Sequence, residues 1–84
     1  MDLISNIKDS VKKKRIFWSE HSIDALEERM LNPDDIINSI INGEVIEKYP
    51  DGRPFSSCLI LGSVNEKYLH IVVGYNEKKN SVIL

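Results

Sequence analysis

The sequence is poor in the residue types that build disulfides and metal centres. Cys58 is the single cysteine among 84 residues, so the chain can form no internal disulfide and has no cysteine pair at metal-ligand spacing. It also lacks a glycine-rich phosphate loop and a serine-based triad motif. We therefore expect no metal and no cofactor, and any chemistry must rest on ordinary side chains.

Long apolar runs are also missing. Hydrophobic residues make up 42% of the chain, but no run is long enough to span a membrane. The start, Met-Asp-Leu-Ile-Ser, lacks the basic and apolar regions of a signal peptide. These features predict a single small domain over residues 1–84, located in the cytoplasm and without a membrane partner.

Charge is unevenly distributed along the chain. The formal net charge is −2, yet residues 1–18 carry five basic and two acidic side chains. The basic excess centres on a run formed by Lys12, Lys13, Lys14 and Arg15. One interpretation is a solvated helix end that complements the helix dipole. The other is a contact with nucleic acid or another anion, although the overall acidity argues against a general polyanion binder.

The first half of the chain has helical periodicity. Apolar residues recur at helical spacing in residues 2–13, and Ile16-Phe17-Trp18 is a short first strand or an extended entry. Ser19 is a candidate N-cap for a second helix that runs to about Met30 or Leu31. Asn32 followed by Pro33 begins a third helix that ends at Gly43.

The second half alternates like strands. Strands are expected over residues 44–49, 55–62 and 68–75, and a last one begins at Ser81. Hairpin-length connections favour antiparallel pairing. The predicted fold class is α+β, with two layers: about three N-terminal helices packed on an antiparallel meander sheet of three or four strands. Because the chain stops inside its last strand, either the native protein is longer or another copy completes the sheet at that C-terminal edge.

The second helix carries the best clue to function. At 100° per residue, His21, Ala25 and Arg29 fall at roughly 0°, 40° and 80° around the helix. A titratable ring and a permanent cation therefore share one stripe. The side chains expected on the opposite, core-facing stripe are those of Ile23, Leu26 and Met30.

His70 is the only other histidine. Alternation along its strand places it on one face with Tyr68, Val72 and Gly74. It is either a hydrogen-bonded histidine in a sheet or a general acid or base, because histidine ordinarily titrates near neutral pH.

Arg53 occupies a turn, where it is either merely solvated or binds a ligand. Cleavage of a phosphodiester by the ribose 2′-hydroxyl needs a base, an acid and cations, and neither a metal nor a protein nucleophile. His21, His70, Arg29 and Arg53 supply these residue types as candidate catalytic residues. The basic run 12–15 and Tyr49 are the candidate RNA-binding residues, with Tyr49 either stacking on a base or packing on the core.

Several stretches of the chain resemble a small prokaryotic family known as domain of unknown function 4258. They are Ser-Glu-His-Ser-Ile-Asp-Ala-Leu-Glu-Glu-Arg, Glu-Val-Ile-Glu-Lys-Tyr-Pro-Asp-Gly-Arg-Pro, Ser-Cys-Leu-Ile-Leu-Gly and Leu-His-Ile-Val-Val-Gly. The resemblance as a whole covers residues 16–84. The motif positions that match are His21, Arg29, Tyr49, Pro50, Gly62 and His70. Two departures are Ala25, where family members commonly have an arginine, and the absence of the Thr and Tyr that typically follow the last strand.

That family is similar to the RelE/ParE-like and BrnT-like toxins of bacterial toxin–antitoxin pairs. The resemblance implies a RelE-like helix–sheet fold, cleavage of messenger RNA and a neighbouring antitoxin protein as partner. The alternative hypothesis is a non-catalytic protein-interaction domain that binds its partner through the sheet edge or the first helix.

Overall fold

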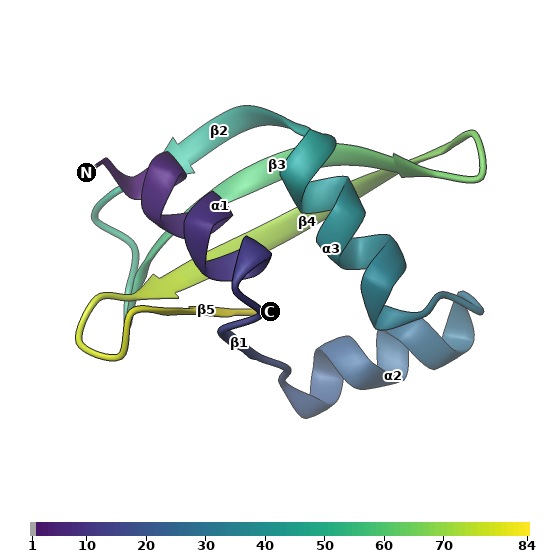
Figure 1. Cartoon of the computed structure of the whole chain (residues 1–84), viewed down its shortest axis with the longest axis horizontal. Coiled ribbons are helices and arrows are strands. Elements are labelled where there is room, and N and C mark those ends of the chain that lie inside the picture. The colour runs from purple at the N-terminus through teal and green to yellow at the C-terminus, as the bar shows by residue number, and fades with distance from the viewer. Residues whose placement is uncertain (1) are drawn as a thin grey trace.

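The computed structural model describes residues 2–84 and has the α+β architecture that the sequence predicts. Three helices precede and flank a sheet (Figure 1). The helices are α1 (Leu3–Lys12), α2 (Glu20–Glu28) and α3 (Pro33–Asn42), and the strands are β1 (Ile16–Phe17), β2 (Glu44–Tyr49), β3 (Ser56–Val64), β4 (Lys67–Asn76) and β5 (Ser81–Ile83).

The sheet differs from the expected meander at one edge. Its strand order is β1-β5-β4-β3-β2, and β1 pairs with β5 in parallel. The other neighbouring strands pair antiparallel, as expected. The two-residue strand β1 thus adds a fifth strand and makes the sheet mixed. It also covers β5, so the prediction that the C-terminal strand forms an open edge for another copy is wrong.

Each helix begins where the sequence supplies an acceptor for its free N–H groups. The side chains of Asp2 and Ser19 accept from the N–H groups of Ser5 and Ser22. Asn32 and Asp35 form a reciprocal capping box at the start of α3, each side chain accepting from the other backbone N–H at 3.0 Å. The predicted helix starts are therefore confirmed by local hydrogen bonds.

The core lies between the sheet and the two helices α1 and α3. Its fully buried side chains include Ile7 and Val11 of α1, Ile40 of α3 and Ile60 and Val73 of the sheet. Because Ile7 and Val11 are both completely buried, the apolar face of α1 is used within this domain. The first helix is therefore not the free partner-binding helix that the alternative hypothesis offered.

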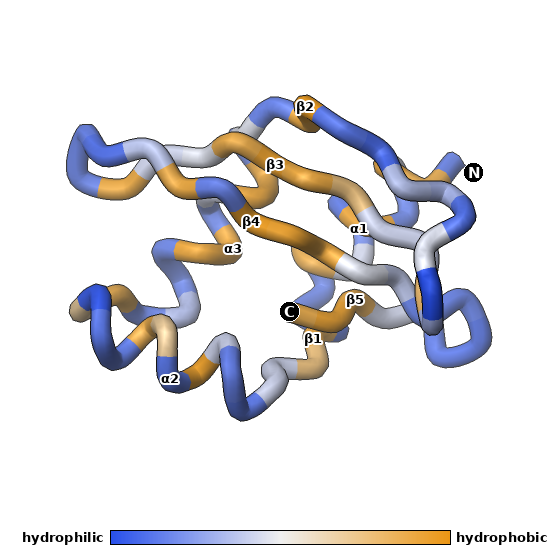
Figure 2. Tube along the Cα trace, turned by 180° about the vertical axis from the view of Figure 1, so that it is seen from behind, coloured by the Kyte–Doolittle hydropathy of each residue, from blue (hydrophilic) through white to orange (hydrophobic). Residues whose placement is uncertain are grey.

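Among the described residues, no helix covers the opposite face of the sheet. Seen from behind in Figure 2, the middle of β3 and β4 is hydrophobic. Leu59 pairs with Val72 and Leu61 with His70, and Val72 is 60% exposed. On β2 the register shifts between Val45 and Glu47. The shift places Val45 opposite the buried Ile60 but Glu47 opposite Leu59, so the alternation expected of a regular strand breaks between these two residues.

Candidate functional site

Helix α2 lies beyond the end of β1 and faces the side of β4 that β5 leaves open (Figures 1 and 2). It begins after the cap residue Ser19 and ends at Glu28, with Arg29 as its C-cap. The inward-facing side chains of α2 are Ser22, Ala25, Leu26 and Arg29, which line a cavity against the sheet. At 100° per residue with His21 at 0°, these four side chains lie between roughly 40° and 140° around the helix. His21 therefore lies just outside one edge of this sector.

Two of the three expected core contacts of this helix are wrong. Leu26 is buried, but Ile23 is 44% exposed and Met30 is 92% exposed. Ile23 does not line the cavity. Met30 follows the helix end and has a φ of 56°, so the helical angle count does not apply to it. The stripe formed by His21, Ala25 and Arg29 was expected to lie opposite the core-facing side chains, but it lines the cavity instead.

The cavity has a volume of about 300 Å³ and joins residues that are far apart in the sequence. His21 and Arg29 enter it from α2, and His70 enters it from β4. All three are exposed to solvent. The apolar part of its lining comes from Trp18, Leu26, Leu31, Ile36, Leu69 and Ile71, with Ala25, Val72 and Leu84 beside them.

His70 reaches this cavity from the helix-free side of the sheet. The burial pattern of β4 alternates, with Tyr68, His70 and Val72 exposed and Val73 and Tyr75 buried. The predicted sharing of one face by His70, Tyr68 and Val72 is therefore confirmed. A titratable ring from the sheet, a second ring from α2 and a permanent cation can approach one ligand here.

Trp18, Ser19 and Ser22 also line the cavity, although the sequence did not single them out as site residues. The Ser22 hydroxyl donates to the Ser19 carbonyl at 2.8 Å, and the Ser19 hydroxyl accepts from the Ser22 N–H at 3.2 Å. Both hydroxyls thus hold the start of α2 in place. Their nearness to His21 in the sequence was the one available signal.

Other predicted site residues lie elsewhere. Arg53 is exposed in the connection between β2 and β3 and does not line the cavity. Tyr49, which is 37% exposed, donates its hydroxyl to Glu47 at 2.8 Å. That hydrogen bond to the carboxylate raises the pKa of Tyr49. The structure therefore brings together His21, Arg29 and His70, but does not bring Arg53 or Tyr49 to the same cavity.

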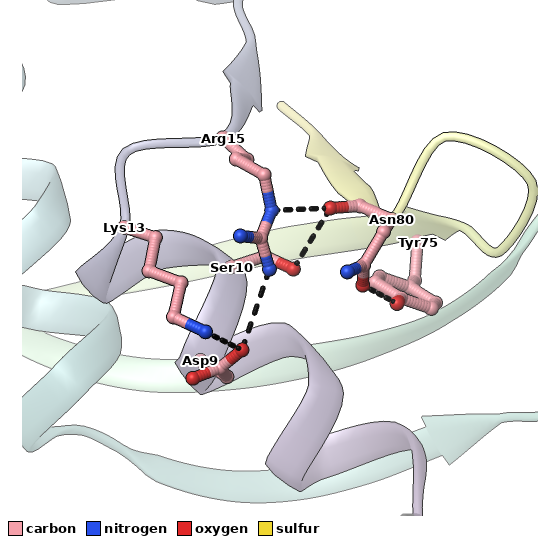
Figure 3. Close-up of polar contacts among 6 residues, drawn as sticks. All are labelled: Asp9, Ser10, Lys13, Arg15, Tyr75 and Asn80. Atoms are coloured by element: carbon pink, nitrogen blue, oxygen red, sulfur yellow. Dashed lines mark hydrogen bonds and ion pairs between the residues drawn. The ribbon is translucent and has the colours of Figure 1, made fainter.

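Half of the basic run is engaged within the protein (Figure 3). Lys13 and Arg15 both contact the Asp9 carboxylate, at 3.2 and 3.3 Å. Arg15 also donates from Nε to the Asn80 carbonyl at 2.8 Å, and this joins the end of α1 to the turn before β5. Lys12 and Lys14 are exposed. The run thus supplies structural contacts as well as a positive surface.

The described residues include no cluster of histidine, cysteine and acidic side chains that could hold a metal ion. Cys58 is fully buried, and its burial raises the pKa of the thiol. A raised pKa disfavours the thiolate, so Cys58 is a packing residue rather than a nucleophile. Within residues 2–84 there is also no helix with the length and apolarity needed to cross a membrane.

Comparison with known families identifies the chain's relatives. The family model described as Domain of unknown function (DUF4258) matches residues 18–84. No curated protein and no solved structure matches the chain. The match begins at Trp18 and includes α2, α3 and the strands β2 to β5, so it contains every residue that lines the cavity. The chain belongs to the DUF4258 family.

Proposed function

We propose that this member of the DUF4258 family is a metal-independent ribonuclease with toxin-like activity. The observation that carries the proposal is the cavity that His21, Arg29 and His70 all line. The two histidines come from different elements and are exposed, so both can reach a bound RNA strand. Catalysis by two histidines and a cation needs no group beyond the side chains of this cavity.

In the proposed reaction, one neutral histidine accepts the proton of a ribose 2′-hydroxyl as this oxygen attacks the adjacent phosphorus. The bond between O2′ and phosphorus forms, and the bond between phosphorus and O5′ breaks. The second histidine, in its protonated form, donates its proton to the leaving O5′. The products are a 2′,3′-cyclic phosphate and a free 5′-hydroxyl. Arg29 balances the negative charge that builds on the other phosphate oxygens.

In this proposal, the remaining candidate residues contact the RNA outside the cavity. The exposed ends of Lys12 and Lys14 would contact the RNA backbone through charge. Arg53 lies outside the cavity and would contact phosphates away from the cleaved bond. An antitoxin partner is part of the proposal only because the family resembles the toxins of toxin–antitoxin pairs.

The test is cleavage of an end-labelled single-stranded RNA by the purified full chain in the presence of a metal chelator. We expect His21→Ala and His70→Ala each to slow cleavage by about 10²–10⁴-fold, because each removes one proton transfer. Arg29→Gln should lower the rate while the pH profile keeps its shape. Arg53→Gln removes the same charge outside the cavity, so it should weaken RNA binding but leave the cleavage rate at saturating RNA unchanged.

Two results would contradict the proposal. The first is no cleavage of any RNA by the unmodified chain. The second is cleavage that survives both histidine substitutions, which would assign the activity to a contaminating nuclease. Products that end in a 3′-phosphate with no cyclic precursor would refute the 2′-hydroxyl mechanism even if RNA is cut.

The non-catalytic interaction domain is a second candidate. Neither of the surfaces first expected for it is free, because β1 covers β5 and α1 packs in the core. One observation still favours it: β4 has a long edge that no strand covers in the described part of the chain.

A further inference from the structure

Strand β4 is much longer than the strand beside it. It runs from Lys67 to Asn76, whereas its pairing with β5 covers only Gly74, Tyr75 and Asn76. On its other side, β3 pairs with it from Lys67 to Tyr75. One edge of β4 is therefore open over residues 68–73 within residues 2–84.

The backbone groups that point to this open edge follow from the hydrogen bonds of β5. In a strand, the N–H and C=O of one residue point to the same side, and the side alternates along the chain. Val82 and Leu84 donate their N–H groups to Arg15 and Phe17 on the β1 side. Ile83 must therefore point toward β4, where its partner is Gly74.

The same alternation then fixes the rest of β4. Gly74 points toward β5, so Val72, His70 and Tyr68 also present their backbone N–H and C=O groups at this edge. The hairpin between β3 and β4 gives the same answer. Its two-residue turn, Asn65-Glu66, has positive φ at both residues. Turns of this kind are flanked by a hydrogen-bonded pair, here Val64 with Lys67, which directs the odd-numbered residues toward β3.

The open edge borders a cavity rather than bare solvent. Leu69, His70, Ile71 and Val72 all line the cavity whose far wall is α2. On the helix-covered side of the sheet the lining is apolar, and Ile71 and Ile36 pack against the core there. The polar lining carries positive or titratable groups from Arg29, His21 and His70, and it includes no carboxylate side chain among the described residues.

We propose that this slot between β4 and α2 binds an extended acidic peptide, which adds a strand antiparallel to β4 and in line with β5. Its backbone pairs with the N–H and C=O groups of His70 and Val72. Apolar side chains on one face of the peptide fill the cavity beside Ile71, and carboxylates on the other face meet Arg29 and the histidines. This binding goes beyond the proposed ribonuclease activity and does not depend on it. Where both occur, the peptide covers His70 and excludes RNA.

The probe for this proposal is a fluorescein-labelled peptide of about seven alternating valine and glutamate residues, a length that matches a typical strand. Binding to the full chain is measured by fluorescence anisotropy. Two further peptides carry N-methyl groups on alternate amides. In one peptide the methyl groups block the amides on one edge of the strand, and in the other they block the amides on the opposite edge. We expect one methylated peptide to bind at least tenfold more weakly and the other to bind like the parent, because only one edge faces β4.

Amide hydrogen exchange locates the contact without altering the protein. With the peptide bound, the amides of His70 and Val72 should gain protection, whereas those of Ile71 and Val73 are protected with or without it because they face β3. Replacing the glutamates with glutamine should weaken binding to the unmodified chain more than it weakens binding to Arg29→Gln, in which only the histidines remain to meet the carboxylates.

Several outcomes would overturn the proposal. Absence of binding would do so, as would an equal loss for both methylated peptides, which would indicate non-directional apolar adhesion. Concentration-dependent protection of His70 and Val72 in the chain alone would assign the slot to a second copy instead. RNA cleavage is scored separately, so failure of peptide binding and failure of the ribonuclease proposal give different results.

Discussion

Gly62 on β3 is a position where α3 packs closely on the sheet. A Cβ placed on Gly62 would fall 2.7 Å from Ser39 Cβ and 3.0 Å from the Ser39 carbonyl oxygen. Ser39 is itself 3% exposed, and its hydroxyl donates to the carbonyls of Asp35 and Ser63. The helix therefore cannot accept Gly62→Ala without moving outward.

The cost can be estimated from opposing effects. Overpacking a well-packed core costs about 1–3 kcal/mol. Replacing glycine by alanine reduces the entropy of the unfolded chain, which returns about 0.4–1 kcal/mol. No described glycine has positive φ, so backbone strain adds nothing. We expect a net loss of about 1–2 kcal/mol, which for a domain of this size lowers Tm by roughly 4–16 °C.

Gly74→Ala on β4 is the matched control. A Cβ there would lie 3.7 Å from the Ile83 carbonyl oxygen and 3.8 Å from Ile83 Cβ, which is ordinary van der Waals contact. Only the entropy effect remains, so Tm should stay level or rise. The assay is thermal and urea unfolding of both variants, followed by circular dichroism. If Gly62→Ala is as stable as Gly74→Ala, the close packing of α3 on β3 is refuted.

Two other predictions concern Cys58 and Asp9. Cys58 is buried, and the pKa of its thiol is raised. A thiol reagent at pH 8 should therefore modify the native chain on the order of a thousandfold more slowly than the urea-unfolded chain. Rapid labelling of the native chain would contradict the burial of Cys58. The Lys13 hydrogen bond, followed by the charges of Lys13 and Arg15, lowers the pKa of Asp9 below 3.8. Its contribution to stability is therefore present above that unfolded-state value and is lost as pH falls through the lower folded-state value. Urea titrations should show that Asp9→Asn is less stable than the unmodified chain at pH 6. This difference in stability should shrink at pH 3 and in high salt. A difference in stability that does not depend on pH would refute the ion pair.

Local signals in the sequence were enough to predict the helices and most strands. Asn32, Pro33 and Asp35 specify the start of α3 through hydrogen bonds made within one turn. Strict alternation along β4 correctly placed His70 and Val72 on one face. It failed on β2, because the register shift between Val45 and Glu47 depends on how that strand pairs with β3. A bulge of this kind leaves no mark in the sequence of the bulged strand alone.

The candidate site was predictable only in part. The spacing of His21 and Arg29 by two helical turns put both side chains within one sector of α2. The direction in which that sector points was not predictable, and the expected core contacts of Ile23 and Met30 were wrong. A short helix with a single buried residue, Leu26, has too weak an apolar face to fix its own orientation.

The sequence by itself determined which residues were available for chemistry: two histidines, few aromatic residues, and one cysteine without a partner. It also determined most of the secondary structure, because caps and periodicity act over a few residues. The tertiary structure alone decided that His70 lies in the same cavity as His21 and Arg29, and that Arg53 does not. It also decided that β1 covers β5 while β4 keeps an open edge. Contacts of this kind join segments far apart in the chain, and no local pattern of residues specifies them.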